Sequence, residues 1–297
     1  MTLASDQLRQ APPQVAPAVE RRRGRNVFSG WWLYLALFGG LVLVVGPFLW
    51  MVLGSFKPQP EFLRSPPTWI PEAPTLDNYG RLFDVLDFPR FFTNSAVVAI
   101  AVMAGNLVFC SMVGYALAKL RFAGRDKLFV LVLATMMVPG SVTVVPLYIL
   151  MSVLGLTNSF GGLILPFLAT AFGVFLMRQF MLGIPDELIE AARIDGASEL
   201  RTFWQIVFPL ATPALATLAI LTFLGSWNSF FWPLIVATDE EMYTLPVALA
   251  TFATGQYQAD HGLLMAGSLI IVLPVLIVFI LLQRLFTQGI ATTGIKG

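Results

Sequence analysis

The chain has 297 residues, of which 57% are hydrophobic and only 12% carry a charge. A soluble domain of ordinary composition has about 45–50% apolar and about 25% charged residues. Too few charged side chains remain to cover a surface that faces water, so the composition excludes an ordinary soluble domain and indicates a surface that largely faces lipid. The formal net charge of +1 argues against a nucleic-acid-binding protein. The single cysteine, Cys110, excludes an intrachain disulfide.

The first 30 residues form a polar tail that ends in the basic run Arg21-Arg22-Arg23-Gly24-Arg25. Because such a segment has little apolar surface to bury, we expect residues 1–30 to be a disordered cytoplasmic tail. The apolar run that follows is longer than the roughly 7–15 residues of a signal-peptide core, and no small-residue cleavage site comes after it. We therefore predict a retained first transmembrane helix and a single transmembrane domain over residues 31–297.

Six apolar stretches approach or exceed the about 20 residues of helix that cross a membrane. Arg178, near the end of the fourth stretch, is the only charged side chain within them and can reach the interface along its apolar stem. Several stretches contain prolines, which membrane helices accommodate; static kinks and a bent, moving pathway are both compatible with them. The predicted transmembrane helices are 31–56, 91–118, 128–153, 163–182, 207–236 and 263–283.

Lysine and arginine divide unevenly between the two sides of these helices. With the N-terminus inside, the inner segments contain 14 of the 18, whereas the outer segments contain only Lys57, Arg64, Arg81 and Arg90. Cytoplasmic loops of membrane proteins have an excess of Lys and Arg. The distribution predicts an all-α membrane protein that crosses the membrane six times, with both termini in the cytoplasm.

The predicted helices lack side chains that several mechanisms need. A proton-coupled carrier usually holds an ionisable group inside its bundle, and none of these helices places one there. A sodium-coupled carrier is disfavoured less strongly, because unwound backbone can bind sodium. His261 is the only histidine and lies in a predicted outer loop, so neither a catalytic set nor a metal site is indicated. Since there is also no phosphate-binding loop, uphill transport would draw its energy from another chain.

The segment 183–206, between the fourth and fifth predicted helices, has the pattern of two short helices joined by a glycine. Pro185 suits the first turn of a helix, and the acidic side chains after it suit the positive helix end. Gly196 interrupts this helix, and Ser198 or Asp195 can cap a second one. The sequence therefore predicts a helix–Gly–helix hairpin on the cytoplasmic side.

The first helix of this hairpin is expected to present a small-residue face. Leu188, Ala191 and Ala192 recur at helical spacing, and Glu190 would be exposed beside them. A connector lying on the lipid surface is the plainer alternative, but anionic lipid headgroups would repel its acidic residues. We therefore predict that the hairpin docks into a groove of a partner protein.

The same segment resembles the EAA loop of the permease subunits of ABC importers. The family pattern is Glu-Ala-Ala, three residues, Gly, nine residues and Ile-x-Leu-Pro, and only Phe208, where Leu is usual, departs from it. A match whose spacing is kept over twenty residues is highly specific. The matching residues are Glu190, Ala191, Ala192, Gly196, Ile206 and Pro209.

Further segments are similar to the carbohydrate-uptake branch of these permeases, and especially to the shorter, six-helix subunit of the maltose type. The similarity covers nearly the whole chain from Trp31 onward. Ser229 stands where Asp often follows Trp-Asn, and His261 where Trp often precedes Gly-Leu-Leu-Met, so the solute stays open. The similar segments are 190–196, 225–234, 244–249, 262–266 and 289–297.

The resemblance implies the type I permease fold of ABC importers and half of a heterodimeric translocation pathway in the bacterial cytoplasmic (inner) membrane. It implies as partners a second permease subunit, two copies of an ABC ATPase and an extracytoplasmic solute-binding protein, besides membrane lipid, and no nucleic acid. The chain itself would be no enzyme and would bind no cofactor or metal, because ATP and Mg²⁺ bind to the partner ATPase.

The resemblance also implies roles for individual segments. The segment 190–203 would sit in a groove of the ATPase, with Glu190 facing a basic residue there and Gly196 permitting the turn. The tail 294–297 would reach the ATPase interface. Arg193 and Asp195 join the motif residues in the set assigned to ATPase coupling. The residues assigned to binding-protein contact are Gly255, Gln256 and Tyr257.

A polar and aromatic patch within the fifth predicted helix is the candidate for solute contact. Sugar sites combine aromatic faces with a few hydrogen-bonding groups, and Trp227, Asn228 and Ser229, with Ser226, offer both. Packing between helices is the alternative, since small and polar residues concentrate there too. In the maltose type the longer subunit supplies most sugar contacts, which favours packing further.

These observations predict the permease subunit of an ATP-driven, binding-protein-dependent importer for a di- or oligosaccharide. An importer of the same type for glycerol phosphate or another small polar solute is the alternative within the family, although the predicted helices offer no cationic groove for a phosphate. A membrane scaffold without a pathway and a self-contained secondary carrier are the other classes. Co-purification with an ATPase distinguishes an importer subunit from a carrier.

Overall fold

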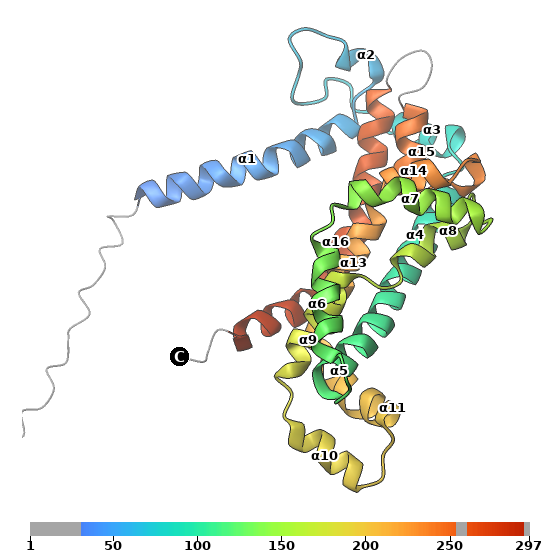
Figure 1. Ribbon diagram of the computed structural model, residues 1–297. Coiled ribbons are helices and arrows are strands. Elements are labelled where there is room, and N and C mark those ends of the chain that lie inside the picture. Colours follow the sequence, from blue (N-terminus) through green and yellow to red (C-terminus); the bar gives the residue numbers. More distant parts are fainter. Residues whose placement is uncertain (1–30, 254–259, 294–297) are drawn as a thin grey trace, which may run out of the picture. The chain divides into compact units, whose positions relative to one another are not determined.

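The computed structural model describes residues 31–253 and 260–293, and within these residues it contains helices and connecting segments but no strand (Figure 1). The chain divides into two units, Met1–Phe48 and Leu49–Gly297. The predicted tail, residues 1–30, and the last four residues lie outside the described part. The all-α class is therefore confirmed for the residues that the structure describes.

The described part of the first unit belongs to helix α1, Trp31–Ser55. From Trp31 to Phe48 the helix consists of apolar residues, Pro47 among them, and glycines. Tyr34 adds a polar group, its phenol. Most of these residues are exposed. A helix that is apolar on every side requires lipid or another apolar surface around it. Its 25 residues span roughly 37 Å at about 1.5 Å per residue, more than a hydrocarbon core of about 30 Å.

A continuous helix of 32 residues, Phe88–Lys119, runs through the second unit. It consists of α4 (Phe88–Gly105), the π-helical segment η2 (Asn106–Cys110) and α5 (Ser111–Lys119). Its α4 part packs on α13, which in turn packs on α16, and its α5 part packs on α9. The packing partners are α9 (Ala171–Leu182), α13 (Thr212–Trp227) and α16 (His261–Thr293).

The remaining short elements connect these helices. They are α2 (Gln59–Phe62), α3 (Asp77–Val85), α6 (Arg125–Met136), α7 (Gly140–Val153), α8 (Phe160–Ile164), η3 (Leu165–Phe167), α10 (Asp186–Ile194), α11 (Glu199–Thr202), η4 (Phe203–Val207), α12 (Phe208–Leu210), α14 (Phe231–Val236), η5 (Glu240–Met242) and α15 (Leu245–Ala253).

Three of the predicted transmembrane helices are bent sharply in the structure. Helices α6 and α7 meet at 101°, where Pro139 and Gly140 interrupt the apolar run. Proline lacks the backbone donor that would continue a helix and disfavours helical geometry in the residue before it, so the break follows from the sequence. The other bent pairs are Phe160–Phe167 with Ala171–Leu182, at 40°, and Glu199–Leu210 with Thr212–Trp227, at 80°.

Among the described residues three helices are long and apolar enough to cross a membrane, and six segments qualify if each bent pair counts as one span. The fifth predicted helix, 207–236, differs most from the structure. It is bent at Ala211, it ends at Trp227, and α14 follows as a separate helix. The boundaries of the six predicted crossings therefore stay predictions of membrane topology.

A buried asparagine fixes the bend between η3 and α9. The Nδ2 of Asn106 donates to the carbonyl oxygens of Val102, at 3.0 Å, and Phe167, at 2.6 Å. Its Oδ1 accepts from the Thr170 hydroxyl at 2.8 Å and from the Cys110 thiol at 3.3 Å. The broken helix frees backbone groups that apolar surroundings cannot satisfy, and Asn106 pairs with one of them.

Helices α5 and α9 approach each other unusually closely. A Cβ atom on Gly114 would lie 2.8 Å from the Cβ of Met177 and 3.0 Å from the backbone nitrogen of Arg178. Small residues permit such close packing of helices in a membrane. The Nε of Arg178 also donates to the Leu117 carbonyl at 3.2 Å, so the two helices are joined by both packing and a hydrogen bond.

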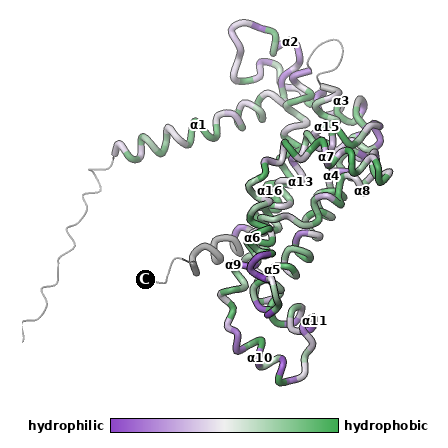
Figure 2. Tube along the Cα trace, in the orientation of Figure 1, coloured by the Kyte–Doolittle hydropathy of each residue, from purple (hydrophilic) through white to green (hydrophobic). Residues whose placement is uncertain are grey.

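Hydrophilic residues gather at the two ends of the continuous helix Phe88–Lys119. Figure 2 shows them around α2 and α3 at one end and around α10 and α11 at the other, with more hydrophobic helices between. The first group contacts the start of α4, and the second contacts α5 through Tyr115 and Lys119. These two polar ends are where soluble partners can reach the chain.

Candidate functional site

The predicted hairpin is present, and Gly196 ends its first helix. The backbone N–H of Ala197 donates to the carbonyl of Ala192 at 2.9 Å, and that of Gly196 donates to the carbonyl of Arg193 at 3.0 Å. This pair of bonds is the Schellman arrangement, which needs a left-handed residue after the helix. Gly196 has φ of +77°, a conformation in which a Cβ is strained.

The second helix of the hairpin begins at a serine cap. Ser198 has an extended backbone, and its hydroxyl accepts the N–H of Arg201 at 3.3 Å. Of the two cap residues that the sequence allowed, the structure selects Ser198, while Asp195 is the last residue of the α10 turn. The turn is therefore set locally at both ends, by the backbone conformation of Gly196 and by the side-chain cap of Ser198.

The burial of the side chains of α10 differs from what a single exposed small-residue face would give. Ile189 and Ala192 are buried against the bundle, whereas Leu188 and Ala191 are exposed. Leu188, Ala191 and Ala192 keep the helical spacing predicted for one face, but the boundary between buried and exposed surface crosses that face, because the helix turns Ala192 inward beside Ile189. Ile194 is 87% exposed, which is unusual for an apolar side chain on a polar hairpin.

Glu190 is one of the residues that line a small hollow beside the hairpin. It is exposed, and within the described residues its carboxylate forms neither a hydrogen bond nor an ion pair. The hollow has a volume of about 150 Å³. Its lining residues are Lys119, Arg121, Asp186, Ile189, Glu190 and Arg193. The arrangement leaves one acidic group of the motif available for a cation on another chain.

The end of the motif lies where the hairpin returns to the bundle. Ile206 belongs to the π-helical η4 and is half-buried, and Pro209 is an exposed residue of α12. The 80° bend follows at Ala211. The motif therefore runs from the middle of α10 through the rest of the hairpin and ends just before a bend, which local proline and π-helical geometry allow.

A cavity of about 310 Å³ lies between α4, α9, α13 and α14. Its polar groups are the hydroxyls of Thr170, Thr222, Ser226 and Ser229, and among the described residues that line it none carries a charge. A mostly apolar pocket with a few hydroxyls suits a neutral solute, an apolar chain or a side chain of a neighbouring subunit.

The predicted patch of Trp227, Asn228 and Ser229 is divided by the end of α13. Ser229 lines the cavity, Asn228 is exposed and donates back to the Leu224 carbonyl at 2.9 Å, and Trp227 is only 2% exposed. The Trp227 indole donates to the Ile271 carbonyl at 3.0 Å. Held in this way, Trp227 has no free ring face for a sugar, which supports the packing alternative for this residue.

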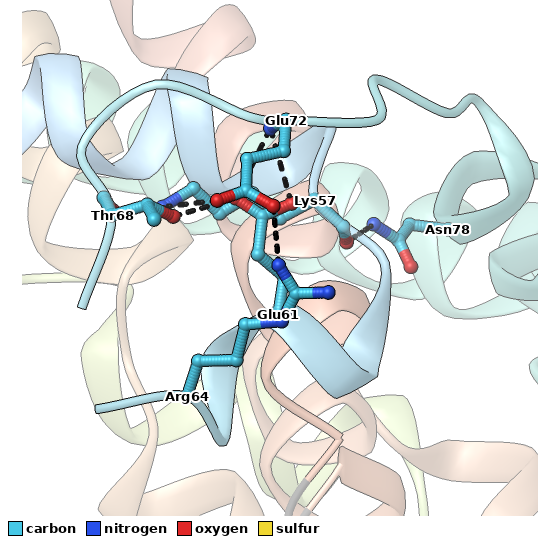
Figure 3. Close-up of polar contacts among 6 residues, drawn as sticks. All are labelled: Lys57, Glu61, Arg64, Thr68, Glu72 and Asn78. Carbon is cyan, nitrogen blue, oxygen red and sulfur yellow. Dashed lines mark hydrogen bonds and ion pairs between the residues drawn. The ribbon is translucent and has the colours of Figure 1, made fainter. Parts of the chain in front are cut away.

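A polar cluster on the predicted outer side, the outer cluster, surrounds Glu61, as Figure 3 shows. The Glu61 carboxylate accepts the Thr68 hydroxyl at 2.6 Å and the backbone N–H of Glu72 at 3.2 Å. Lys57, with a side chain only 3% exposed, lies 3.9 Å from the carboxylate and donates to the Thr68 carbonyl. The opposite charges and the hydrogen bonds compensate for burial of the pair.

The same cluster fixes the outer segment to neighbouring helices. The Nδ2 of Asn78 donates to the carbonyls of Ser55, at 2.9 Å, and Lys57, at 2.8 Å. A Cβ on Gly262 would lie 2.5 Å from the Asn78 side-chain oxygen, so the start of α16 packs directly on it. Arg81 pairs with Asp260. The segment between α1 and α3 is therefore folded onto the bundle.

The comparison with protein families decides what kind of protein contains this hairpin. Residues 110–292, which include the hairpin and the cavity's α13–α14 wall, match the family described as "Binding-protein-dependent transport system inner membrane component". This chain belongs to that family. It is a membrane permease component of a transport system and not an enzyme, as the sequence predicted.

Relatives of the permease are named as permease proteins of transport and uptake systems. It is 40% identical over 279 residues to the arabinooligosaccharides transport system permease protein AraQ of Halalkalibacterium halodurans, covering 93% of this chain and 100% of the relative. It is 35% identical to the diacetylchitobiose uptake system permease protein NgcG of Streptomyces coelicolor, over 82% and 81% of the two chains. It is 33% identical to the sn-glycerol-3-phosphate transport system permease protein UgpE of Pectobacterium atrosepticum, over 92% and 98%.

A solved structure confirms the predicted fold. The permease matches a chain of a bacterial ABC transporter involved in the import of the acidic polysaccharide alginate, with a TM-score of 0.79 and 25% identity. The match covers 86% of this chain and 96% of the other. The all-helical ABC-importer permease fold is therefore shown by structure as well as by sequence.

Several residues that shape the cavity, the bend before α9 and the outer cluster were not predicted from the sequence. Asn106, Lys57 and Glu61 were not predicted, and the cavity wall of Thr170 and Thr222 was not connected with Ser229. The four-residue spacing of Lys57 and Glu61 was the only local indication of their pairing, since their other partners come from distant turns. The predicted binding-protein contacts Gly255, Gln256 and Tyr257 lie outside the described residues.

Proposed function

We propose that the permease forms half of the translocation pathway of an ATP-driven importer for a neutral oligosaccharide. One observation supports this most directly: the hairpin exposes Glu190, whose carboxylate forms neither a hydrogen bond nor an ion pair among the described residues, beside a turn that Gly196 fixes. The relatives that transport arabino-oligosaccharides, diacetylchitobiose and galacto-oligosaccharides support the solute class. The second half of the pathway comes from another permease subunit.

The hairpin is the docking element for an ABC ATPase. Glu190 meets a cation in the ATPase groove, and the exposed Ile194 and Leu200 supply apolar contact beside it. An exposed acidic group pairs with a basic residue without the cost of breaking an existing intrachain bond. Arg193 and Asp195 lie on the same turn and belong to the same contact.

The cavity favours an uncharged solute. Its hydroxyl groups can exchange hydrogen bonds with sugar hydroxyls, and among its described lining residues no cation is available for a phosphate. Glycerol 3-phosphate is the second candidate, because the relative UgpE is named for its transport. In that case the cationic groups come from the other permease subunit.

The permease resides in the bacterial inner membrane with both termini in the cytoplasm, and its outer segments face a solute-binding protein. The excess of Lys and Arg in the predicted inner segments supports this orientation. The two polar ends of Phe88–Lys119 then lie on opposite sides of the membrane, so that the hairpin and the outer cluster meet different partners.

Purification of the transporter tests the docking role. We expect Glu190→Lys to insert and to pair with the second permease subunit, yet to lose the ATPase, because a like charge meets the basic groove. Asp126→Lys is the matched control, since it makes the same charge change on an exposed residue of the same predicted side. Normal ATPase retention and uptake in Glu190→Lys contradict the proposal.

Uptake experiments test the solute class. Vesicles or cells with the complete transporter are supplied with labelled arabino-oligosaccharide, chitobiose or glycerol 3-phosphate, each with its binding protein. The proposal expects ATP-dependent uptake of a neutral oligosaccharide. Uptake of glycerol 3-phosphate alone supports the second candidate, and uptake that continues without any ATPase identifies a secondary carrier instead.

A further inference from the structure

Glu199 joins both limbs of the hairpin to a transmembrane helix. One carboxylate oxygen accepts the Tyr115 hydroxyl of α5 at 2.7 Å, and the other accepts the Nε of Arg193 of α10 at 2.7 Å. Glu199 itself lies in the first turn of α11. The Tyr115 side chain is buried, with the residue 4% exposed, so its position is set by packing and not by solvent. One carboxylate thus links three helices.

A second connection lies one helical turn further along α5. Lys119, with a side chain 5% exposed, donates to the Ile184 carbonyl at 2.6 Å and to Asp186 at 2.5 Å, at the start of the hairpin. Residues four apart lie on the same side of a helix. One face of α5 therefore holds the hairpin at its beginning through Lys119 and at its turn through Tyr115.

The hairpin and α5 form one body with α9, since Gly114 brings α5 into close packing with α9 and Arg178 bonds across to Leu117. The chain between the hairpin and α13 packs on this body as well, because Phe203, Val207 and Ala211 share a hydrophobic cluster with Tyr115 and Met177. It passes through the π-helical η4 and the 80° bend at Ala211, after Pro209 has removed one helical donor. Such interrupted helices are places where segments change direction.

We propose that Tyr115 and Glu199 are positioning residues that make the hairpin move together with α5 and α9. This inference rests on the proposed docking of the ATPase to the hairpin. Without the link, a displacement imposed on α10 turns the hairpin about its own ends. With the link, the same displacement moves α5 and, through the Gly114 contact, α9, which borders the cavity at Thr170 and Phe172.

The experiment measures solute imported per ATP hydrolysed by the complete transporter in proteoliposomes. We expect Tyr115→Phe and Glu199→Gln to keep the ATPase attached but to lower this ratio about fivefold, the lower end of typical coupling between sites. Because both variants break the same link, the double variant is expected to lower the ratio no further than the stronger single variant. Tyr148→Phe and Glu240→Gln are the matched controls, since neither side chain forms a hydrogen bond within the described residues and both lie outside the hairpin.

Hydrogen exchange of residues 186–202 in the assembled complex provides a second readout. The link predicts faster exchange there in both variants and unchanged exchange in the controls. A parental ratio in both single variants, or losses that add in the double variant, overturns the positioning role. Loss of the ATPase itself in Tyr115→Phe also overturns it, because the link is then part of docking. Failure of the docking proposal is recognised separately, by normal function of Glu190→Lys.

Discussion

Gly196 shows how one backbone angle sets the shape of the docking element. Its φ of +77° permits the two hydrogen bonds that end α10, and no atom lies within 4 Å of the position that its Cβ would take. A substitution there meets no steric obstacle from neighbouring residues. The cost therefore comes from the backbone alone, which makes this position a clean test of the turn.

For Gly196→Val we expect the hairpin to lose about 1–2 kcal/mol of local stability, the cost of holding a residue with a Cβ in the left-handed region. Gly196→Asn is expected to lose less, because asparagine tolerates this region better than other residues. Hydrogen exchange of residues 186–202 measures the difference. Equal exchange in Val, Asn and parent proteins contradicts a role for the positive φ. Insertion and pairing with the second permease subunit should stay normal in both variants.

Glu61 makes the outer cluster sensitive to pH. The Thr68 hydroxyl bond, together with the Glu72 amide and the positive charges of Lys57 and Arg64, lowers the pKa of the Glu61 carboxyl, although burial opposes this. A carboxyl whose folded pKa lies below its unfolded value stabilises the fold above the unfolded pKa. The contribution is therefore present above the ordinary value of 4.5 and is lost as the pH falls through the lowered folded pKa.

We therefore expect protease cleavage within residues 57–78 to increase as the pH falls below 4.5, while the same segment stays protected at neutral pH. The Glu61→Gln variant should show weaker protection at neutral pH and little further change on acidification. A steep acid transition that persists in Glu61→Gln assigns the effect to another group.

At the scale of elements, the sequence predicted which segments are helical but not where these helices bend. The apolar run 128–153 was predicted as one helix because hydropathy averages over Pro139 and does not record chain direction. The structure bends there by 101°. The hairpin was predicted in more detail, since its caps and its glycine act on neighbouring residues. Asn106 escaped prediction because Phe167 and Thr170, with which it pairs, lie far along the chain. Glu61 escaped prediction because Thr68 and Glu72 meet it from an irregular loop whose path the sequence pattern does not give.

At the end of α13 two nearby residues have different surroundings, because Trp227 packs against aromatic side chains and Ser229 lines the cavity. The indole of Trp227 stacks on Phe223, with ring centres 5.6 Å apart, and meets Phe92 edge-on at 5.5 Å. We expect Trp227→Ala to lower the stability of the permease by about 3–5 kcal/mol, as is typical when a large buried aromatic side chain is removed. Thermal unfolding of the purified complex measures this loss.

Ser229→Ala is the comparison for Trp227→Ala, because Ser229 lines the cavity and is only half-buried. Its thermal unfolding should match the parent, and any defect should appear as weaker solute uptake. Parental stability in Trp227→Ala, accompanied by a specific uptake defect, restores the predicted sugar contact for Trp227.

At the scale of the whole molecule, apolar side chains remain exposed over several helices. Many large hydrophobic residues of α1, α6, α7 and α16 have no partner surface among the described residues of this chain. Lipid covers such surfaces in a membrane protein, and a second permease subunit covers part of them in a heterodimer. These exposed surfaces are available to lipid and to the second permease subunit proposed above.

The orientation of the permease is tested by reporters at two positions. A reporter fused after Gly297 should lie in the cytoplasm, and one inserted within residues 239–260 should lie outside. The physical reason is the distribution of Lys and Arg, of which the predicted outer segments hold only four. A reporter at residue 196 serves as an independent control, because the hairpin must share the side of the C-terminus. A C-terminus on the outer side contradicts the topology, and with it the contact between the hairpin and an ATPase.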